Sequence, residues 1–112
     1  MVICEAGDVA IVPFPFTDMA VAKPRPALAL SAPKANGESG NTIFAMITTA
    51  AKSHWPTDVP LADGQAAGLA AASLVRFKLF TLDNRMVARK IGALSPRDRL
   101  AVRKMLRAVM GV

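Results

Sequence analysis

The shortness of the apolar runs before residue 95 is the feature that most constrains the fold of this chain. These runs are rich in β-branched and aromatic residues, and turn-forming residues end each of them before a long helix could form. They predict strands over residues 9–16, 26–32, 41–49, 57–61, 74–82 and 86–91. Pro13 and Pro15 within the first run indicate an edge strand or a strand that bends. We therefore expect about five to seven short antiparallel strands.

The segments between these runs are predicted to be turns and loops. Residues 17–24 have no clear periodicity and end in a proline pair that brackets Arg25. They indicate a hairpin loop, and loops of this kind often carry function. The polar, glycine-containing residues 33–40 predict the turn of a second hairpin, and residues 50–56 and 62–68 are also read as loops.

The run at residues 74–82 alternates in part. Val75 and Phe77 are expected to point one way from the strand, and Arg76 and Lys78 the other way. The alternation therefore predicts a sheet with one face that is polar at Arg76 and Lys78.

A helical period appears only after Ser95. Ser95 can cap a helix, and Asp98 is spaced to complete a capping box. One apolar stripe is formed by Val102, Met105, Leu106 and Val109. Arginines recur on the opposite side at positions 99, 103 and 107, and Gly111 ends the helix. The whole pattern predicts a mainly β protein: a small, strongly bent antiparallel barrel with a C-terminal helix against it.

Length and composition limit the class of protein. A chain of 112 residues is expected to form a single domain over residues 1–112, and 53% hydrophobic residues argue against a disordered chain. No apolar stretch reaches the roughly 18 residues needed to span a bilayer. Glu5 and Asp8 stand where a secretory signal would need positive charge, so a cytoplasmic protein without membrane contact is expected. Because Cys4 and His54 are the only residues of their kinds, we expect no disulfide, no metal site and no cofactor.

The net charge of +6 is unevenly distributed along the chain. Residues 1–75 hold four basic and six acidic residues, a net charge of −2, whereas residues 76–112 hold ten basic and two acidic residues, a net charge of +8. A concentrated positive field attracts a polyanion, so nucleic acid or an acidic protein is one expected partner. A solvated basic helix face accounts for the same pattern equally well.

General motifs argue against some functions and leave the roles of His54 and Trp55 undecided. The chain has no phosphate-binding glycine loop and no Gly-x-Ser-x-Gly elbow, which argues against a nucleotide-driven motor or a serine hydrolase of that type. His54 can act as a general base near neutral pH, but it can equally be a packing or exposed loop residue. Trp55 with Lys52 is typical of a base-stacking element beside a phosphate contact. Trp55 can also simply cover one end of the barrel.

Five blocks of sequence, taken in order, resemble the MazF/PemK family of toxins. The blocks are GDVAIVPF at residues 7–14, RPALALS at 25–31, ITT at 47–49, the group Gly68-Leu69, Ser73, Val75-Arg76 and Thr81-Leu82-Asp83, and KIGALS at 90–95. Each block is short, but together they cover residues 7–95 in the family's order.

This resemblance implies a fold and an activity. The family has a bent barrel related to the Src-homology-3-like fold, and forms a two-fold homodimer with a groove for single-stranded RNA. Its members are the toxins of type II toxin–antitoxin systems. They cut RNA at short sequences without a metal, through attack of the ribose 2′-hydroxyl, leaving a 2′,3′-cyclic phosphate. A cognate antitoxin inhibits them by laying an acidic C-terminal tail across the groove.

The resemblance also implies site residues. Arg25 matches the arginine with acid/base and charge-stabilising duty, and Thr48 matches a hydroxyl that binds the phosphate. Arg76 is similar to a second active-site arginine of PemK-type members, but Lys78 stands where those members have an aspartate base. The expected catalytic residues are therefore Arg25 and Thr48. The expected RNA-binding residues are Lys23, Thr49, Lys52, His54, Trp55, Arg76 and Lys78.

Two other functions remain open from the sequence. CcdB-like toxins use the same barrel to poison gyrase through an aromatic chain end, but this chain ends in Met110, Gly111 and Val112 without that tryptophan. The second alternative is an RNA-binding barrel that has lost its cutting activity, because Lys78 replaces the expected acid.

Overall fold

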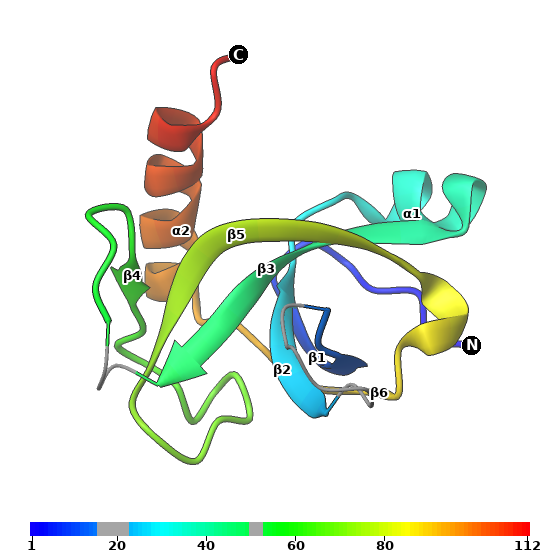
Figure 1. Ribbon diagram of the computed structural model, residues 1–112, viewed down its shortest axis with the longest axis horizontal. Coiled ribbons are helices and arrows are strands. Elements are labelled where there is room, and N and C mark those ends of the chain that lie inside the picture. The colour runs from blue at the N-terminus through cyan, green and yellow to red at the C-terminus, as the bar shows by residue number, and fades with distance from the viewer. Residues whose placement is uncertain (16–22, 50–52) are drawn as a thin grey trace.

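A single curled antiparallel sheet makes up most of the computed structural model, which describes residues 1–15, 23–49 and 53–112 (Figure 1). The six strands lie in the order β4-β5-β3-β2-β1-β6. Their bounds are Asp8–Pro13 for β1, Pro24–Ala29 for β2, Asn41–Thr49 for β3, Val59–Pro60 for β4, Ser73–Asp83 for β5 and Arg89–Ala93 for β6. A short helix α1 (Pro33–Ser39), a 3-10 turn η1 (Asn84–Met86) and the C-terminal helix α2 (Pro96–Val109) complete the chain.

Two register shifts bend the sheet. Between β3 and β5, Ala45 pairs with Leu79 whereas the next residue, Met46, pairs with Arg76. Phe77 and Lys78 therefore lie in a bulge, and both long strands arch over the rest of the sheet there (Figure 1). A second shift lies between Val9 and Ala10 where β1 pairs with β6. The expected bent antiparallel architecture with a C-terminal helix is confirmed.

The two faces of the sheet bury separate apolar clusters. Successive residues of β3 alternate between them, since Phe44 belongs to one cluster and its neighbours Ala45 and Ile47 to the other. The cluster around Ile47 packs against Val102 of α2, so the helix covers this face. The cluster around Phe44 is enclosed by the curl of the sheet, and the ring of Phe44 stacks on Phe80 with centroids 5.6 Å apart.

Helix α2 begins as the sequence predicts. The Ser95 Oγ accepts a hydrogen bond from the Asp98 N–H at 3.2 Å, which confirms the cap. Val102 is buried and the next two stripe residues, Met105 and Leu106, are half-buried, but Val109 is 37% exposed at the helix end. The arginines at positions 99, 103 and 107 are exposed, as expected.

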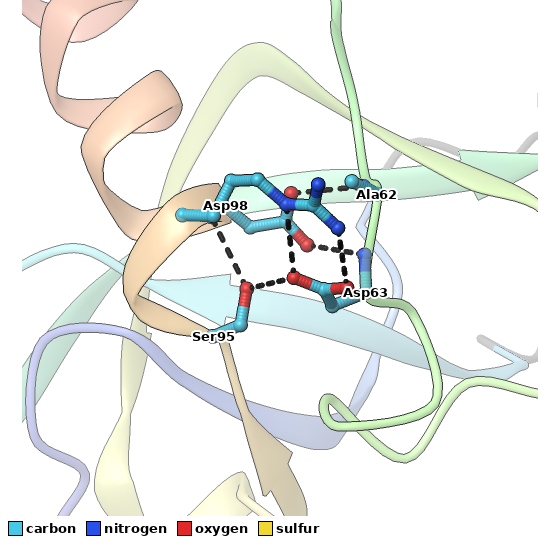
Figure 2. A network of polar contacts seen from close by, with 5 residues as sticks. Ala62, Asp63, Ser95 and Asp98 are labelled. Atoms are coloured by element: carbon cyan, nitrogen blue, oxygen red, sulfur yellow. Dashed lines mark hydrogen bonds and ion pairs between the residues drawn. The ribbon is translucent and has the colours of Figure 1, made fainter.

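The predicted capping-box role of Asp98 is wrong. Its carboxylate accepts hydrogen bonds from the backbone N–H groups of Ala62 and Asp63, both at 2.8 Å (Figure 2). In turn the Ser95 hydroxyl donates to Asp63 at 2.6 Å, and Arg97 forms an ion pair with the same carboxylate at 2.8 Å. This network fastens the turn after β4 to the start of α2.

Other local expectations are corrected by tertiary contacts. Within the predicted turn at residues 33–40, Pro33–Ser39 form helix α1, because the buried Asn36 amide donates to the backbone oxygens of Cys4 and Ser31. Strand β1 is not an edge strand, since it pairs with both β2 and β6, but its register shift agrees with the alternative of a bent strand. The loop predicted over residues 17–24 lies mostly outside the described residues.

The remaining predicted elements differ at their ends. The fourth predicted strand is reduced to two residues, and β6 begins at Arg89 because residues 84–86 form η1. In the part of the chain that the structure describes, no helix is both long and apolar enough to cross a membrane.

Candidate functional site

The register of the central strands brings Arg25 and Thr48 together. Ala27 of β2 pairs with Met46 of β3 in antiparallel register. Extending this register by two residues places Arg25 opposite Thr48, and the period of two along each strand puts both on the same face of the sheet. The two residues line one open pocket with a volume of about 350 Å³. The rest of its lining is Phe14, Pro26, Met46, Ile47, Thr49 and Ser73.

The pocket is lined by apolar residues on one side and by the cationic Arg25 on another. Phe14 is only 3% exposed, and its ring meets the ring of Phe80 edge-on at 6.0 Å. Arg25, by contrast, is exposed and forms no ion pair within residues 1–15, 23–49 and 53–112. Among the described residues, no carboxylate takes up its guanidinium donors, which are suited to bind an anion that enters the pocket. No carboxylate or imidazole of the described residues lines this pocket.

Among the other predicted RNA-binding residues, Thr49 contributes to this pocket and Lys23 does not. Thr49 pairs with Ser73 at the end of β3 and lines the pocket. Lys23 is exposed but does not line the pocket, and its backbone oxygen accepts from the Phe14 N–H at 3.1 Å. Lys52 lies outside the described residues.

Arg76 is buried on the sheet face that the alternation of β5 predicted to be polar. Only 6% of the residue is exposed. Its Nε donates to Asp58 Oδ1 at 3.0 Å and its Nη2 to Asp58 Oδ2 at 2.8 Å, while Nη1 donates to the Ser53 hydroxyl at 2.8 Å. The hydrogen bonds from Arg76 hold the pKa of the Asp58 carboxyl below its ordinary value, against the opposing effect of burial.

Asp58 is a site residue that the sequence reasoning missed. A buried guanidinium requires a partner, and Asp58 is the sole acidic residue between Glu38 and Asp63. This isolated position of Asp58 in the sequence was the signal that could have identified it as the partner of Arg76. It could be used only once Arg76 was known to be buried, because the alternation of β5 predicts a polar face but not its burial.

Three further predicted residues surround the Arg76–Asp58 pair and the bulge. Trp55 is 38% exposed, and the Arg76 guanidinium carbon lies 5.0 Å from the centre of its ring. His54 is exposed beside it. Lys78 is exposed in the bulge of β5 and does not line the pocket.

Some basic residues of the last third of the chain form ion pairs with acidic residues of the same protein. The ion pairs between described residues engage four of these basic residues: Arg76 with Asp58, Arg85 with Asp83, Lys90 with Asp8, and Arg97 with Asp63. Exposed basic residues without an ion pair in the described chain are Arg89, Arg99, Arg103, Lys104 and Arg107. Among the same described residues, no three His, Cys, Asp or Glu side chains gather into a group that could hold a metal ion.

Asp58 should make the stability of the protein depend on pH in the acid range. Because its pKa in the folded protein lies below the ordinary 3.8, the stabilisation is complete above that ordinary value and is lost as the pH falls through the lowered pKa. Urea unfolding of wild type and Asp58→Asn, measured from about pH 7 to about pH 2, should show a difference in unfolding free energy that narrows below about pH 4. A difference that stays constant over this range would contradict the assignment.

The chain matches a known protein family over most of its length. A model of the PemK-like, MazF-like toxins of type II toxin–antitoxin systems matches residues 5–110. A comparison with curated proteins gave no match.

Solved structures with the same fold were found at low sequence identity. MazF in a MazE–MazF complex (Form-III) from Deinococcus radiodurans superposes with a TM-score of 0.78 and 24% identity over 99% of both chains. MazF alone (Form-I) from the same organism gives a TM-score of 0.76 and 23% identity over 100% of both chains. A mycobacterial endoribonuclease in complex with its cognate antitoxin gives 0.77 and 17% identity over 100% of this chain and 97% of that one. These likenesses establish the fold.

Proposed function

Because the chain belongs to the PemK-like, MazF-like toxins of type II toxin–antitoxin systems, we propose that it is an endoribonuclease that cuts single-stranded RNA at short sequences. The observation that carries the proposal is that Arg25 and Thr48, which come from different strands, line the same open pocket. A guanidinium and a hydroxyl side by side are suited to bind one phosphate group.

The proposed reaction is an internal transesterification at that phosphate. The ribose 2′-oxygen forms a bond to the adjacent phosphorus as its hydroxyl loses a proton to solvent water. The bond from phosphorus to the 5′-oxygen breaks, and its electron pair leaves with that oxygen, which gains a proton. The products are a 2′,3′-cyclic phosphate and a free 5′-hydroxyl.

Arg25 and Thr48 supply two parts of this chemistry. The planar fork of the Arg25 guanidinium donates to two phosphate oxygens, stabilises the charge of the phosphorane and protonates the leaving oxygen. The Thr48 hydroxyl donates a hydrogen bond to the same phosphate. Since Arg25 provides the positive charge, the proposed reaction needs no metal ion. We assign no general base within the pocket, whose described lining has neither carboxylate nor imidazole.

We propose that the RNA strand extends from the pocket across the neighbouring exposed residues. Thr49 lies at the pocket rim, and Lys23, His54, Trp55 and Lys78 are exposed near the strands that form it. Lys52 belongs to the same prediction. The exposed basic residues of the last third would attract an RNA strand or an acidic antitoxin tail. We further expect a homodimer that acts in the cytoplasm, where such RNA is found.

Incubation of the purified protein with a mixed RNA in EDTA tests this function. We expect cleavage at a short recurring sequence, with a 2′,3′-cyclic phosphate and a 5′-hydroxyl at the new ends. Thr48→Val, which keeps the shape of the side chain but removes its hydroxyl, should slow cleavage by about 10-fold, the effect of losing one hydrogen bond to a charged group. Absence of cleavage, or ends of another kind, would refute the proposed reaction.

A further inference from the structure

The guanidinium of Arg76 is almost fully engaged within the protein. Four hydrogen bonds run from it to Asp58 and Ser53, the fourth being from Nη2 to the Ser53 backbone oxygen at 3.2 Å. An arginine side chain has five N–H donors, so about one remains. The carboxylate of Asp58 also neutralises the charge at 2.8 Å. Arg76 is therefore poorly placed to bind a phosphate.

The same ion pair fixes Trp55 in two ways. Asp58 Oδ2 accepts a hydrogen bond from the backbone N–H of Trp55 at 2.9 Å. The backbone N–H of Asp58 donates to the backbone oxygen of Trp55 at 3.0 Å. The Arg76 guanidinium lies over the indole, 5.0 Å from the ring centre. Both the backbone and the ring of Trp55 are thus held by a buried pair, while 38% of the residue stays exposed.

The residues that hold this indole neighbour residues that line the pocket of Arg25 and Thr48. Arg76 pairs across the sheet with Met46, which lines the pocket. Ser53 follows Thr49, another lining residue, by four positions, so their Cα atoms are at most about 14 Å apart. A nucleotide next to one bound in the pocket could reach Trp55.

We propose that Arg76 is a positioning residue. Together with Asp58 it holds Trp55 as a platform on which an unpaired base of the RNA stacks, next to the phosphate that is cut. An indole fixed in advance loses little conformational entropy when the base arrives, so the rigid pair strengthens binding. This inference rests on the proposed endoribonuclease function, and it gives Arg76 a role other than contact with phosphate.

Trp55 is the only tryptophan of the chain, so intrinsic fluorescence reports on this residue alone. The probe is a 2′-O-methylated copy of an RNA segment that the protein cuts, which lacks the attacking hydroxyl. Binding of this probe should quench the Trp55 emission. If the probe binds without changing the emission, the stacking proposal is overturned while the endoribonuclease function stands. If no RNA is cut at all, the proposed function fails, and this inference fails with it.

Substitutions of Trp55 test the platform without disturbing the ion pair. Trp55→Ala should raise the Kd for a labelled probe by about 10-fold, as expected for one lost stacking contact. Trp55→Phe retains an aromatic face and should recover most of that affinity. An affinity of Trp55→Ala equal to that of wild type would overturn the proposal.

A charge-neutral double variant tests the role of Arg76. Arg76→Met with Asp58→Asn removes one positive and one negative charge, so the net charge of +6 is kept. This variant should lose about as much affinity as Trp55→Ala, and the same two substitutions should cost nothing further in the Trp55→Ala background. If the affinity lost through Trp55→Ala and the affinity lost through the double variant add up when all three substitutions are combined, the positioning role is overturned.

Salt dependence separates positioning from phosphate contact. The slope of log Kd against log salt should be the same for the double variant and wild type, because no phosphate contact is lost. Arg25→Ala, by comparison, should reduce the slope by about 0.7, the value for one phosphate of a single strand. A reduction of that size in the double variant would make Arg76 a phosphate ligand and overturn the proposal.

Discussion

Replacing Arg25 with alanine is expected to slow RNA cleavage by at least about 100-fold, the effect of removing one donor that stabilises a developing anion. Arg25 is exposed at the mouth of the pocket and forms no ion pair with the described residues. Its loss should therefore leave the melting temperature nearly unchanged. Single-turnover cleavage of a short RNA, together with thermal unfolding of the same samples, measures both effects.

Two variants make this result specific. Lys34→Ala removes one positive charge from helix α1, where the side chain is exposed and does not line the pocket, and should cut RNA at close to the wild-type rate. Arg25→Lys keeps the charge but loses the planar fork, so its rate should lie between those of wild type and alanine. Cleavage by Arg25→Ala at the wild-type rate would remove Arg25 from the reaction.

A second large effect is expected on stability, from Gly92→Ala. A Cβ at position 92 would lie 2.5 Å from the carbonyl carbon of Ala67 and 2.8 Å from the amide nitrogen of Gly68. Gly68 in turn has a φ of +78°, and a Cβ there would lie 2.3 Å from the oxygen of Ile91. These obstacles are backbone atoms, which cannot rotate away. Gly92→Ala should therefore lower the unfolding free energy by about 3 kcal/mol and the melting temperature by about 10 °C.

Gly37→Ala is the matched control for Gly92→Ala. Gly37 lies in helix α1, and a Cβ there would meet nothing within 4 Å. The same substitution should raise the unfolding free energy by about 0.5–1 kcal/mol, because alanine restricts the unfolded chain and favours a helix. Urea unfolding of both variants measures the difference. Equal effects at the two positions would show that the contact between the backbones at residues 67–68 and 91–92 has no special cost.

The close contact between these backbones also gives a physical reason for part of the family resemblance. Gly68 opens one of the blocks that resemble the family, and Gly92 lies in another. The two glycines are 24 positions apart in the chain, yet the backbones beside them touch. Both glycines can be seen in the sequence. Only the structure shows that a side chain at either position would collide with the backbone next to the other glycine.

Elements set by near neighbours could be predicted from the sequence. The strand at Asn41–Thr49 was predicted with its observed bounds, and the cap at Ser95 and the buried stripe around Val102 were also correct. These features depend on residues two to four positions apart, whose periodicity can be read directly. Helix α1 was missed because its Asn36 is held by partners outside the segment.

The candidate site also combines features that the sequence predicted with features that only the tertiary structure shows. The sequence determined that Arg25 precedes one strand candidate and that Thr48 lies near the end of another, and the family resemblance selected them as a pair. Only the tertiary structure decided that Ala27 pairs with Met46, the register that brings Arg25 and Thr48 to one pocket. It also decided that Arg76 turns inward to Asp58. Local periodicity fixes which way a side chain points within a strand, but register and ion-pair partners depend on the packing of distant segments, which no short window of sequence contains.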